Sequence, residues 1–134
     1  MEKILFDSGL RKYELGNGIL SFNPLDPNLY ERFMHAADKF AELENELVSE
    51  AQAEEGGASR VLEIMKRFDQ KAKALLNDVF GPGNDFDHML AGVNMMAVAD
   101  NGERVISNLM NALTPILEQG AKECAASFMH KGDT

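Results

Sequence analysis

Asp85, Asp87 and His88 form the one cluster of carboxylates with an imidazole in the sequence. These groups are common metal ligands, but a metal site needs further ligands at fixed spacing. The sequence offers no His-x-x-x-His motif, no cysteine pair and no calcium-loop pattern to supply them. We therefore expect no metal site at this cluster. Asp85 or Asn84 should instead cap a short helix, and His88 should be exposed.

Other nucleophiles and the paired glycines lack the context that their chemistry needs. Cys124 is the single cysteine and has no histidine near it in sequence, so we expect it to act as a small buried apolar side chain. Ser107 and Ser127 lie in no nucleophile-elbow motif. Gly81-Pro82-Gly83 follows a predicted helix and precedes no Lys-Ser/Thr pair, so it does not match a phosphate-binding loop. The sequence predicts no catalytic residue and no cofactor, and we expect that the protein is not an enzyme.

Length, charge and hydropathy limit the class of protein. A chain of 134 residues is expected to form a single domain, residues 1–134. The net charge of −9 is concentrated in residues 26–57, which carry nine acidic and two basic side chains. Such an acidic surface repels phosphate backbones and anionic membranes, so we expect no nucleic-acid and no membrane partner. The start of the chain lacks the apolar core of a signal peptide, and a lone cysteine suits a reducing compartment; both predict a soluble, cytoplasmic protein.

Residues 1–25 are expected to hold a β-hairpin. Gly16-Asn17-Gly18 lies between two segments in which apolar and polar residues alternate, and it matches a tight hairpin turn. We expect β-structure at residues 4–6 and again at residues 10–22, with the larger side chains of the ribbon half-buried. A two-stranded hairpin is marginally stable alone, so it should pack on the helices or join the sheet of another chain.

Residues 26–80 are expected to form an antiparallel pair of helices. Asp26 and Pro27 match a helix start, and this helix should end at Gln52 or Ala53. A break at residues 55–59 precedes the second helix, for which Ser59 is a candidate cap. Spacings of three and four residues predict two apolar seams: Tyr30, Phe33, Ala37, Phe40, Leu47 and Ala51, interrupted by Glu44, and Val61, Met65, Phe68, Ala72, Leu75 and Val79. Basic side chains off the second seam are expected to face the acidic first helix: Lys66, Arg67, Lys71 and Lys73.

Residues 81–102 are expected to be a connecting segment with one short helix, which leads to a final helix within residues 103–134. The final helix should begin near Asp100, where Glu103 would complete a capping box. Pro115 should kink it and Gly120 should weaken it, and residues 130–134 should fray. Its predicted buried stripe is Val105, Leu109, Leu113, Ile116 and Leu117, widened by Ile106 and Met110. The predicted fold class is therefore mainly α, an antiparallel helical bundle with an N-terminal β-hairpin.

The connecting segment carries more apolar side chains than a linker in a small domain needs. Its run of five apolar residues, 95–99, predicts that part of the segment is exposed for docking. Methionines at helical spacing also suit a core, so both interpretations stay open for the methionines. The candidate partner-binding residues are Met89, Leu90, Val93, Met95, Met96 and Val98.

Several short motifs follow one another along the chain in a characteristic order. Residues 18–26 read Gly-Ile-Leu-Ser-Phe-Asn-Pro-Leu-Asp and are followed by Phe33. Val79-Phe80-Gly81 ends the second predicted helix, residues 86–94 read Phe-Asp-His-Met-Leu-Ala-Gly-Val-Asn, and residues 97–102 read Ala-Val-Ala-Asp-Asn-Gly. In this order and spacing, the stretch from Tyr13 to Leu117 resembles a family of small tail proteins from phages and prophages of Gram-positive bacteria.

The resemblance implies a function that the residue chemistry alone does not. The family is taken to consist of tail assembly chaperones, which bind the tape-measure protein while the tail is built. The resemblance implies that the partner is the tape-measure protein, with the tail-tube protein as a possible second partner. It also implies a location in the host bacterial cytoplasm, and a homo-oligomer is a further possibility. Two alternatives remain: a structural tail component that is retained in the virion, or a small helical adaptor or inhibitor that acts on a host protein.

Overall fold

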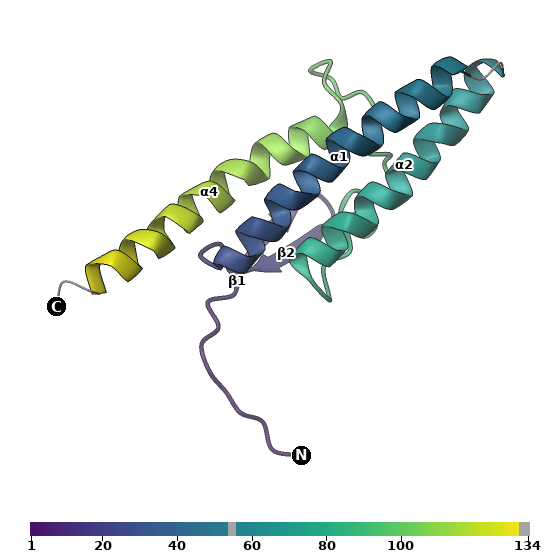
Figure 1. Cartoon of the computed structure of the whole chain (residues 1–134). Helices are drawn as coiled ribbons and strands as arrows, with labels where there is room; N and C mark the ends of the chain where they lie inside the picture. Colours follow the sequence, from purple (N-terminus) through teal and green to yellow (C-terminus); the bar gives the residue numbers. More distant parts are fainter. Residues whose placement is uncertain (54–55, 132–134) are drawn as a thin grey trace.

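The computed structural model describes residues 1–53 and 56–131 and confirms a mainly helical chain with an N-terminal hairpin (Figure 1). The elements in chain order are β1 (Arg11–Leu15), β2 (Gly18–Phe22), α1 (Pro27–Ala53), α2 (Gly57–Phe80), α3 (Phe86–Met89) and α4 (Val105–Lys131). In Figure 1, α1 runs antiparallel to both α2 and α4, and the hairpin lies behind the start of α1. Within the described residues, no helix is both long and apolar enough to cross a membrane.

The hairpin has the predicted turn and a simple register. β1 and β2 are antiparallel, with Tyr13 opposite Leu20 and Leu15 opposite Gly18. Gly16 has a φ of 55°, and Asn17 is not among the residues with positive φ, which matches a type II′ turn. Leu20 and Phe22 are buried, and the ring of Tyr13 stacks on Phe22 at a centroid distance of 4.8 Å. The face of the ribbon that carries these side chains is therefore part of the core.

The prediction of β-structure at residues 4–6 was wrong. Residues 1–10 form no strand, and Ile4, Leu5 and Phe6 are exposed. We call residues 1–10 the N-terminal arm; it is tied to the rest of the molecule near its end, where the Asn23 side chain donates to the Ser8 carbonyl at 3.0 Å. β-Propensity alone does not make a strand when no partner strand is present.

The helices α1, α2, α3 and α4 share one core with the hairpin. α1 begins at Pro27 and its first turn is capped as predicted, because Asn28 N donates to Asp26 Oδ1 at 2.9 Å. The seams lie slightly to one side of the predicted positions: Tyr30 and Ala37 are only half-buried, while Ile64 is buried in α2. The core cluster is Leu20, Phe22, Leu29, Phe33, Ala36, Phe40, Phe68, Ala72, Leu76, Val79, Phe80, Phe86, Met89, Met95, Ile106, Leu109, Leu113 and Leu117.

The ends of α2 differ in how well the sequence predicted them. Ser59 is not a cap, because α2 already begins at Gly57 and its cap residue, Gly56, makes no side-chain hydrogen bond. The C-terminal end is as predicted, since Gly81 has a φ of 90° and its N–H donates to Asn77 O. Glu55, the first residue of the predicted break, lies outside the described residues.

Among the described residues, ion pairs join α1 to α2 at Glu50. Glu50 accepts from Arg60 at 3.0 Å and also from Arg67, so one acidic side chain of α1 does face basic side chains of α2. Lys73 does not follow this prediction, because it is buried and pairs with Asp69 and Asp87 instead. Lys66 and Lys71 are exposed.

α4 begins five residues later than predicted. Asp100 and Glu103 do not form a capping box; Val105 N and Ile106 N donate instead to the carbonyls of Ala97 and Met95. A capping side chain is unnecessary here because backbone carbonyls satisfy two of the free N–H groups of the first turn. The helix continues through Pro115 and Gly120 to Lys131 (Figure 1). Residues 132–134 of the predicted frayed tail lie outside the described residues.

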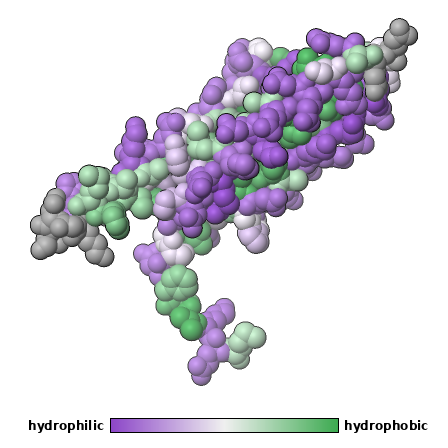
Figure 2. All heavy atoms as spheres, in the orientation of Figure 1, coloured by the Kyte–Doolittle hydropathy of each residue, from purple (hydrophilic) through white to green (hydrophobic). Residues whose placement is uncertain are grey.

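Two apolar patches lie away from the body of the molecule. In Figure 2 one patch lies on the N-terminal arm and one near the far end of α4. The side chains of Phe6 and Phe128 are 79% and 80% exposed, respectively. The rest of the visible surface is mainly hydrophilic (Figure 2).

Candidate partner-binding site

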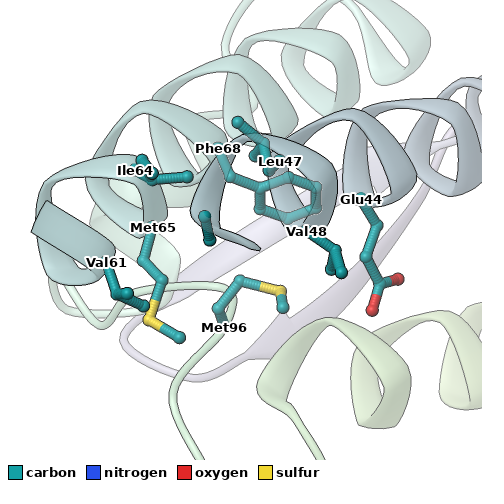
Figure 3. Close-up of a pocket in the computed structure, with 9 residues that line it drawn as sticks. Glu44, Leu47, Val48, Val61, Ile64, Met65, Phe68 and Met96 are labelled. Carbon is teal, nitrogen blue, oxygen red and sulfur yellow. The ribbon is translucent and has the colours of Figure 1, made fainter. Parts of the chain in front are cut away.

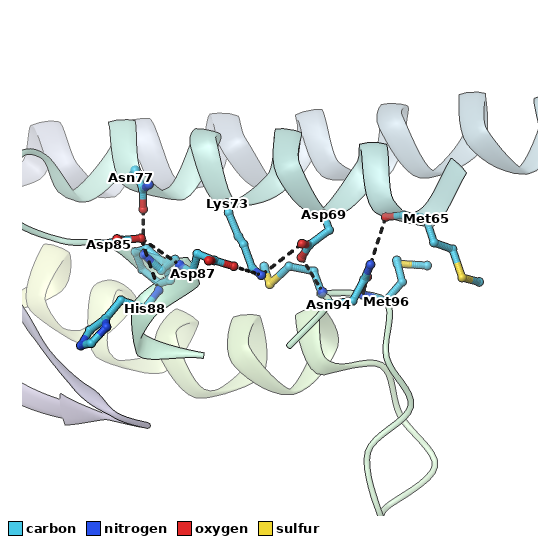
Figure 4. Close-up of polar contacts among 11 residues, drawn as sticks. Met65, Asp69, Lys73, Asn77, Asp85, Asp87, His88, Asn94 and Met96 are labelled. Atoms are coloured by element: carbon cyan, nitrogen blue, oxygen red, sulfur yellow. Dashed lines mark hydrogen bonds and ion pairs between the residues drawn. The ribbon is translucent and has the colours of Figure 1, made fainter. Parts of the chain in front are cut away.

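One face of α2 carries four polar groups that hold the connecting segment. They lie at intervals of four residues, so successive groups are stacked along the same side of the helix (Figure 4). The groups are the Met65 carbonyl, the Asp69 carboxylate, the Lys73 ammonium and the Asn77 side-chain carbonyl. We refer to these four groups as the polar ladder of α2.

The C-terminal half of the polar ladder holds α3. Asn77 Oδ1 accepts from Phe86 N at 2.9 Å, and Lys73 Nζ donates to Asp87 Oδ1 at 2.6 Å. Asp85 caps α3, as its Oδ1 accepts from Asp87 N at 3.1 Å. These contacts fix a helix of only four residues, which would be too short to be stable by itself.

The N-terminal half of the polar ladder fixes the segment after α3. Asp69 Oδ1 accepts from Met95 N at 2.8 Å, and Asn94 Nδ2 donates to the Met65 carbonyl at 3.3 Å. Asn94 Oδ1 in turn accepts from Met96 N at 2.8 Å. The backbone on both sides of the Met95 side chain is therefore held, and Met96 follows in a defined position.

Lys73 is the charged centre of the polar ladder. Its side chain is 6% exposed, and its Nζ lies 3.1 Å from Asp69 Oδ2 as well as 2.6 Å from Asp87 Oδ1. Burial by itself would lower the pKa of Lys73, but the hydrogen bonds and negative charges of Asp87 and Asp69 outweigh that effect and raise the pKa. The lysine is thus held in its charged form.

Met96 forms part of an apolar pocket between α1 and α2 (Figure 3). The pocket has a volume of about 90 Å³, and its exposed wall is entirely apolar. Figure 3 shows the Met96 side chain lying between Met65 of α2 and Val48 of α1. The lining residues are Glu44, Leu47, Val48, Ala51, Val61, Ile64, Met65, Phe68 and Met96.

The candidate partner-binding residues divide into accessible and inaccessible side chains. Met89 and Met95 are buried in the core, with 2% and 0% exposure, so a partner cannot touch them in this conformation. Leu90 and Met96 are half-buried. Val93 and Val98 are exposed, at 44% and 62%. Of the six residues, Met96 is the one that lines the pocket.

One indication of the pocket is visible in the sequence. Glu44 interrupts the apolar seam of α1, and the pocket lies along the part of α1 from Glu44 to Ala51. In its other wall, Val61, Met65 and Phe68 are seam residues that the periodicity assigned simply to the helix pair, and Ile64 lies off the predicted seam. That these side chains leave a pocket depends on the placement of Met96, which local sequence patterns do not report.

The groups considered for chemistry either make structural contacts or are exposed. Asp85 is a helix cap, Asp87 pairs with Lys73, and the His88 side chain is exposed, as predicted. In residues 1–53 and 56–131, no group of three or more His, Cys, Asp or Glu side chains is arranged to hold a metal ion. Cys124 is half-buried rather than buried.

No protein-family model matches the chain, and no curated protein or solved structure matches it either.

Proposed function

We propose that this chain is a tail assembly chaperone of a phage or prophage, which binds the tape-measure protein in the host bacterial cytoplasm and is not an enzyme. The family resemblance of residues 13–117 supports the phage assignment. The apolar pocket between α1 and α2 is the single structural observation that carries the binding role.

The pocket has a size and character that suit an apolar side chain. A cavity needs a volume of roughly 10–15 Å³ to hold one buried water. The pocket has a volume of about 90 Å³, and its exposed wall has no polar atom. Val48 forms one side and is itself 47% exposed, so apolar surface continues from the pocket to the outside of α1. An apolar residue of a partner helix would fill the pocket and cover this surface.

The charge around the pocket selects among apolar helices. α1 carries six acidic residues against two basic ones, and the acidic residue Glu44 lies at the pocket. A partner helix with basic residues next to its apolar stripe would complement this surface. The same negative charge would keep the complex soluble and repel other complexes. Tail-tube subunits would then displace the chaperone as the tail grows.

The test is co-expression of the full chain with the tape-measure protein of the same genome, followed by size-exclusion chromatography with light scattering. We expect a soluble complex of defined stoichiometry and a tape-measure protein that is insoluble when expressed alone. A tape-measure protein that behaves identically with and without this chain contradicts the proposed function.

A matched pair of variants tests the pocket separately. Val48→Lys adds a charge at the pocket wall, and Met34→Lys adds the same charge to α1 at a side chain that is 37% exposed and lies outside the pocket. We expect Val48→Lys and Met96→Lys to abolish co-elution, and Met34→Lys to retain it. Loss with all three variants, or with none, would reject the pocket as the binding site. Circular dichroism of each variant alone checks that the fold is intact.

Two further measurements distinguish the alternatives. A structural tail component would be found in purified virions, whereas a chaperone would be absent from them. An adaptor or inhibitor of a host protein would act on its target when no tail protein is present. Either result would replace the proposed function.

A further inference from the structure

The sheet of this protein has one closed edge and one open edge. At the outer edge of β2, Ser21 N donates to Asn84 Oδ1 at 2.9 Å, and Asn84 Nδ2 donates back to Ser21 O at 3.0 Å. The sheet has two strands, so the outer edge of β1 has no strand beside it. Within the described part of the chain, the backbone of Lys12 and of Glu14 has no hydrogen bond to a segment outside the hairpin.

The register identifies which backbone groups of β1 point outward. In a hairpin with a two-residue turn, the pair that closes the turn exchanges hydrogen bonds, and every second pair along the ladder does the same. The closing pair is Leu15 with Gly18, and Tyr13 with Leu20 is the next bonded pair. The N–H and C=O groups of Lys12 and Glu14 therefore point away from β2. They form a short row of free donors and acceptors.

We propose that β1 pairs antiparallel with β1 of a second copy, centred on Tyr13, so that two copies form one four-stranded sheet. A two-fold axis through this pair makes the contact self-complementary, which is the usual arrangement in a homodimer. The closed edge of β2 leaves β1 as the edge at which the sheet can grow. A sheet of four strands also overcomes the marginal stability of an isolated pair.

Charge selects this register from the alternatives. Outward-pointing residues of one strand must face outward-pointing residues of the other, so neighbouring permitted registers differ by a shift of two residues. In the register centred on Tyr13, Lys12 lies opposite Glu14 of the second copy, and the reverse pair forms across the axis. The neighbouring registers place Lys12 opposite Lys12 or Glu14 opposite Glu14. Opposite charges stabilise a cross-strand pair and like charges destabilise it.

The other face of the ribbon is compatible with the same pairing. Tyr13 is half-buried and would lie directly opposite Tyr13 of the second copy, at a Cβ separation of about 4.5–5.5 Å. Its ring already stacks on Phe22, which meets Phe80 edge-on at 5.1 Å. The two tyrosines would join the aromatic clusters of the two copies. On the N-terminal side of Arg11 the chain turns away from the direction of β1, because Gly9 has a φ of 76° and the Ser8 carbonyl accepts a hydrogen bond from Asn23.

The test is the oligomeric state of the full chain at increasing concentration, measured by size-exclusion chromatography with light scattering. We expect a monomer–dimer equilibrium, because an edge of five residues is a small contact. Lys12→Glu and Glu14→Lys should each weaken the dimer about tenfold or more, since each places like charges opposite each other. The double variant Lys12→Glu with Glu14→Lys restores both pairs and should dimerise like the wild type.

Disulfide trapping gives the register independently. In a background with Cys124→Ser, Tyr13→Cys should form an intermolecular disulfide on mild oxidation, because its Cβ atoms would meet across the axis. Ile19→Cys, a more exposed position on β2, should not. A wild-type protein that is monomeric at all concentrations overturns the proposal. Single charge variants that dimerise like the wild type, or a double variant that fails to recover, overturn it as well.

Discussion

A Cβ atom built on Gly120 would lie 1.7 Å from the carbonyl oxygen of Pro24. Gly120 is buried in the middle of α4, and Pro24 lies in the turn between β2 and α1. The glycine is therefore what allows α4 to pass directly over the backbone that leads into α1. Its helix-weakening effect, which the sequence predicted, is offset by a close approach that no other residue permits.

Gly120→Ala should destabilise the protein. In an ordinary helix the exchange would stabilise by about 0.5–1 kcal/mol. Here the added methyl group meets backbone atoms, so we expect a loss of roughly 1–3 kcal/mol in the free energy of unfolding. Urea denaturation followed by circular dichroism measures the change. The reverse exchange at the exposed Ala126 of the same helix is the control and should cost about 0.5–1 kcal/mol. A stabilised Gly120→Ala variant would show that α4 can move away from Pro24 freely.

Lys73→Met should lower the free energy of unfolding by more than Lys71→Met does. The variant leaves Asp69, whose side chain is 15% exposed, without its cation, and we expect a cost of about 1–3 kcal/mol. Lys71→Met lies on the same helix at an exposed site and should change stability by less than about 0.5 kcal/mol. Equal urea midpoints for the two variants would show that the polar ladder contributes little to folding.

The elements that the sequence predicted best are those with local signals. The turn at Gly16 needs a positive φ, and the start of α1 has both a capping aspartate and a proline at its first position. Helical periodicity likewise placed half of the buried apolar residues of α2, namely Phe68, Ala72 and Val79. Signals of this kind act within a few residues, so a sequence displays them directly.

The features that the sequence did not predict depend on long-range placement. α4 begins at Val105 because the carbonyls of Met95 and Ala97 accept its first hydrogen bonds, and no side-chain motif marks that start. Lys73 resembled a surface lysine because its partner Asp87 lies 14 residues away in the connecting segment. The pocket was missed for the same reason, since it exists only where Met96 meets the helix pair.

The raised pKa of Lys73 predicts a loss of stability in strong alkali. A group whose pKa is higher in the folded state contributes its full stabilisation below its unfolded pKa, and that contribution disappears as the pH rises through the folded value. The window therefore lies above the ordinary lysine value of 10.5. We expect the difference in stability between wild type and Lys73→Met to be constant from pH 7 to about pH 9. It should shrink as the pH rises above 10.5. A difference that stays the same up to the alkaline limit of folding would contradict the raised pKa.

Asn84 should be required as an amide and not merely as a polar side chain. Its Oδ1 accepts from Ser21 N, while its Nδ2 donates to the carbonyls of Ser21 and Phe80 at 3.0 Å each. Asn84→Ala leaves these buried groups unpaired and should cost roughly 1–3 kcal/mol. Asn84→Asp keeps the acceptor but brings a carboxylate oxygen against two carbonyl oxygens, so it should cost at least as much.

Hydrogen exchange at the amide of Ser21 locates the effect of Asn84. In both variants this amide should exchange faster than in the wild type, relative to amides in the middle of α1, because β2 loses the side chain that closes its outer edge. Asp85→Asn is the matched control: it alters the adjacent helix cap and leaves the contacts of Ser21 in place. Because Asn84 ties β2 to the end of α2, faster exchange confined to the hairpin would show that the hairpin opens as a unit from the helices. Uniformly faster exchange would instead mean that Asn84 stabilises the whole core, with the hairpin and the helices unfolding together.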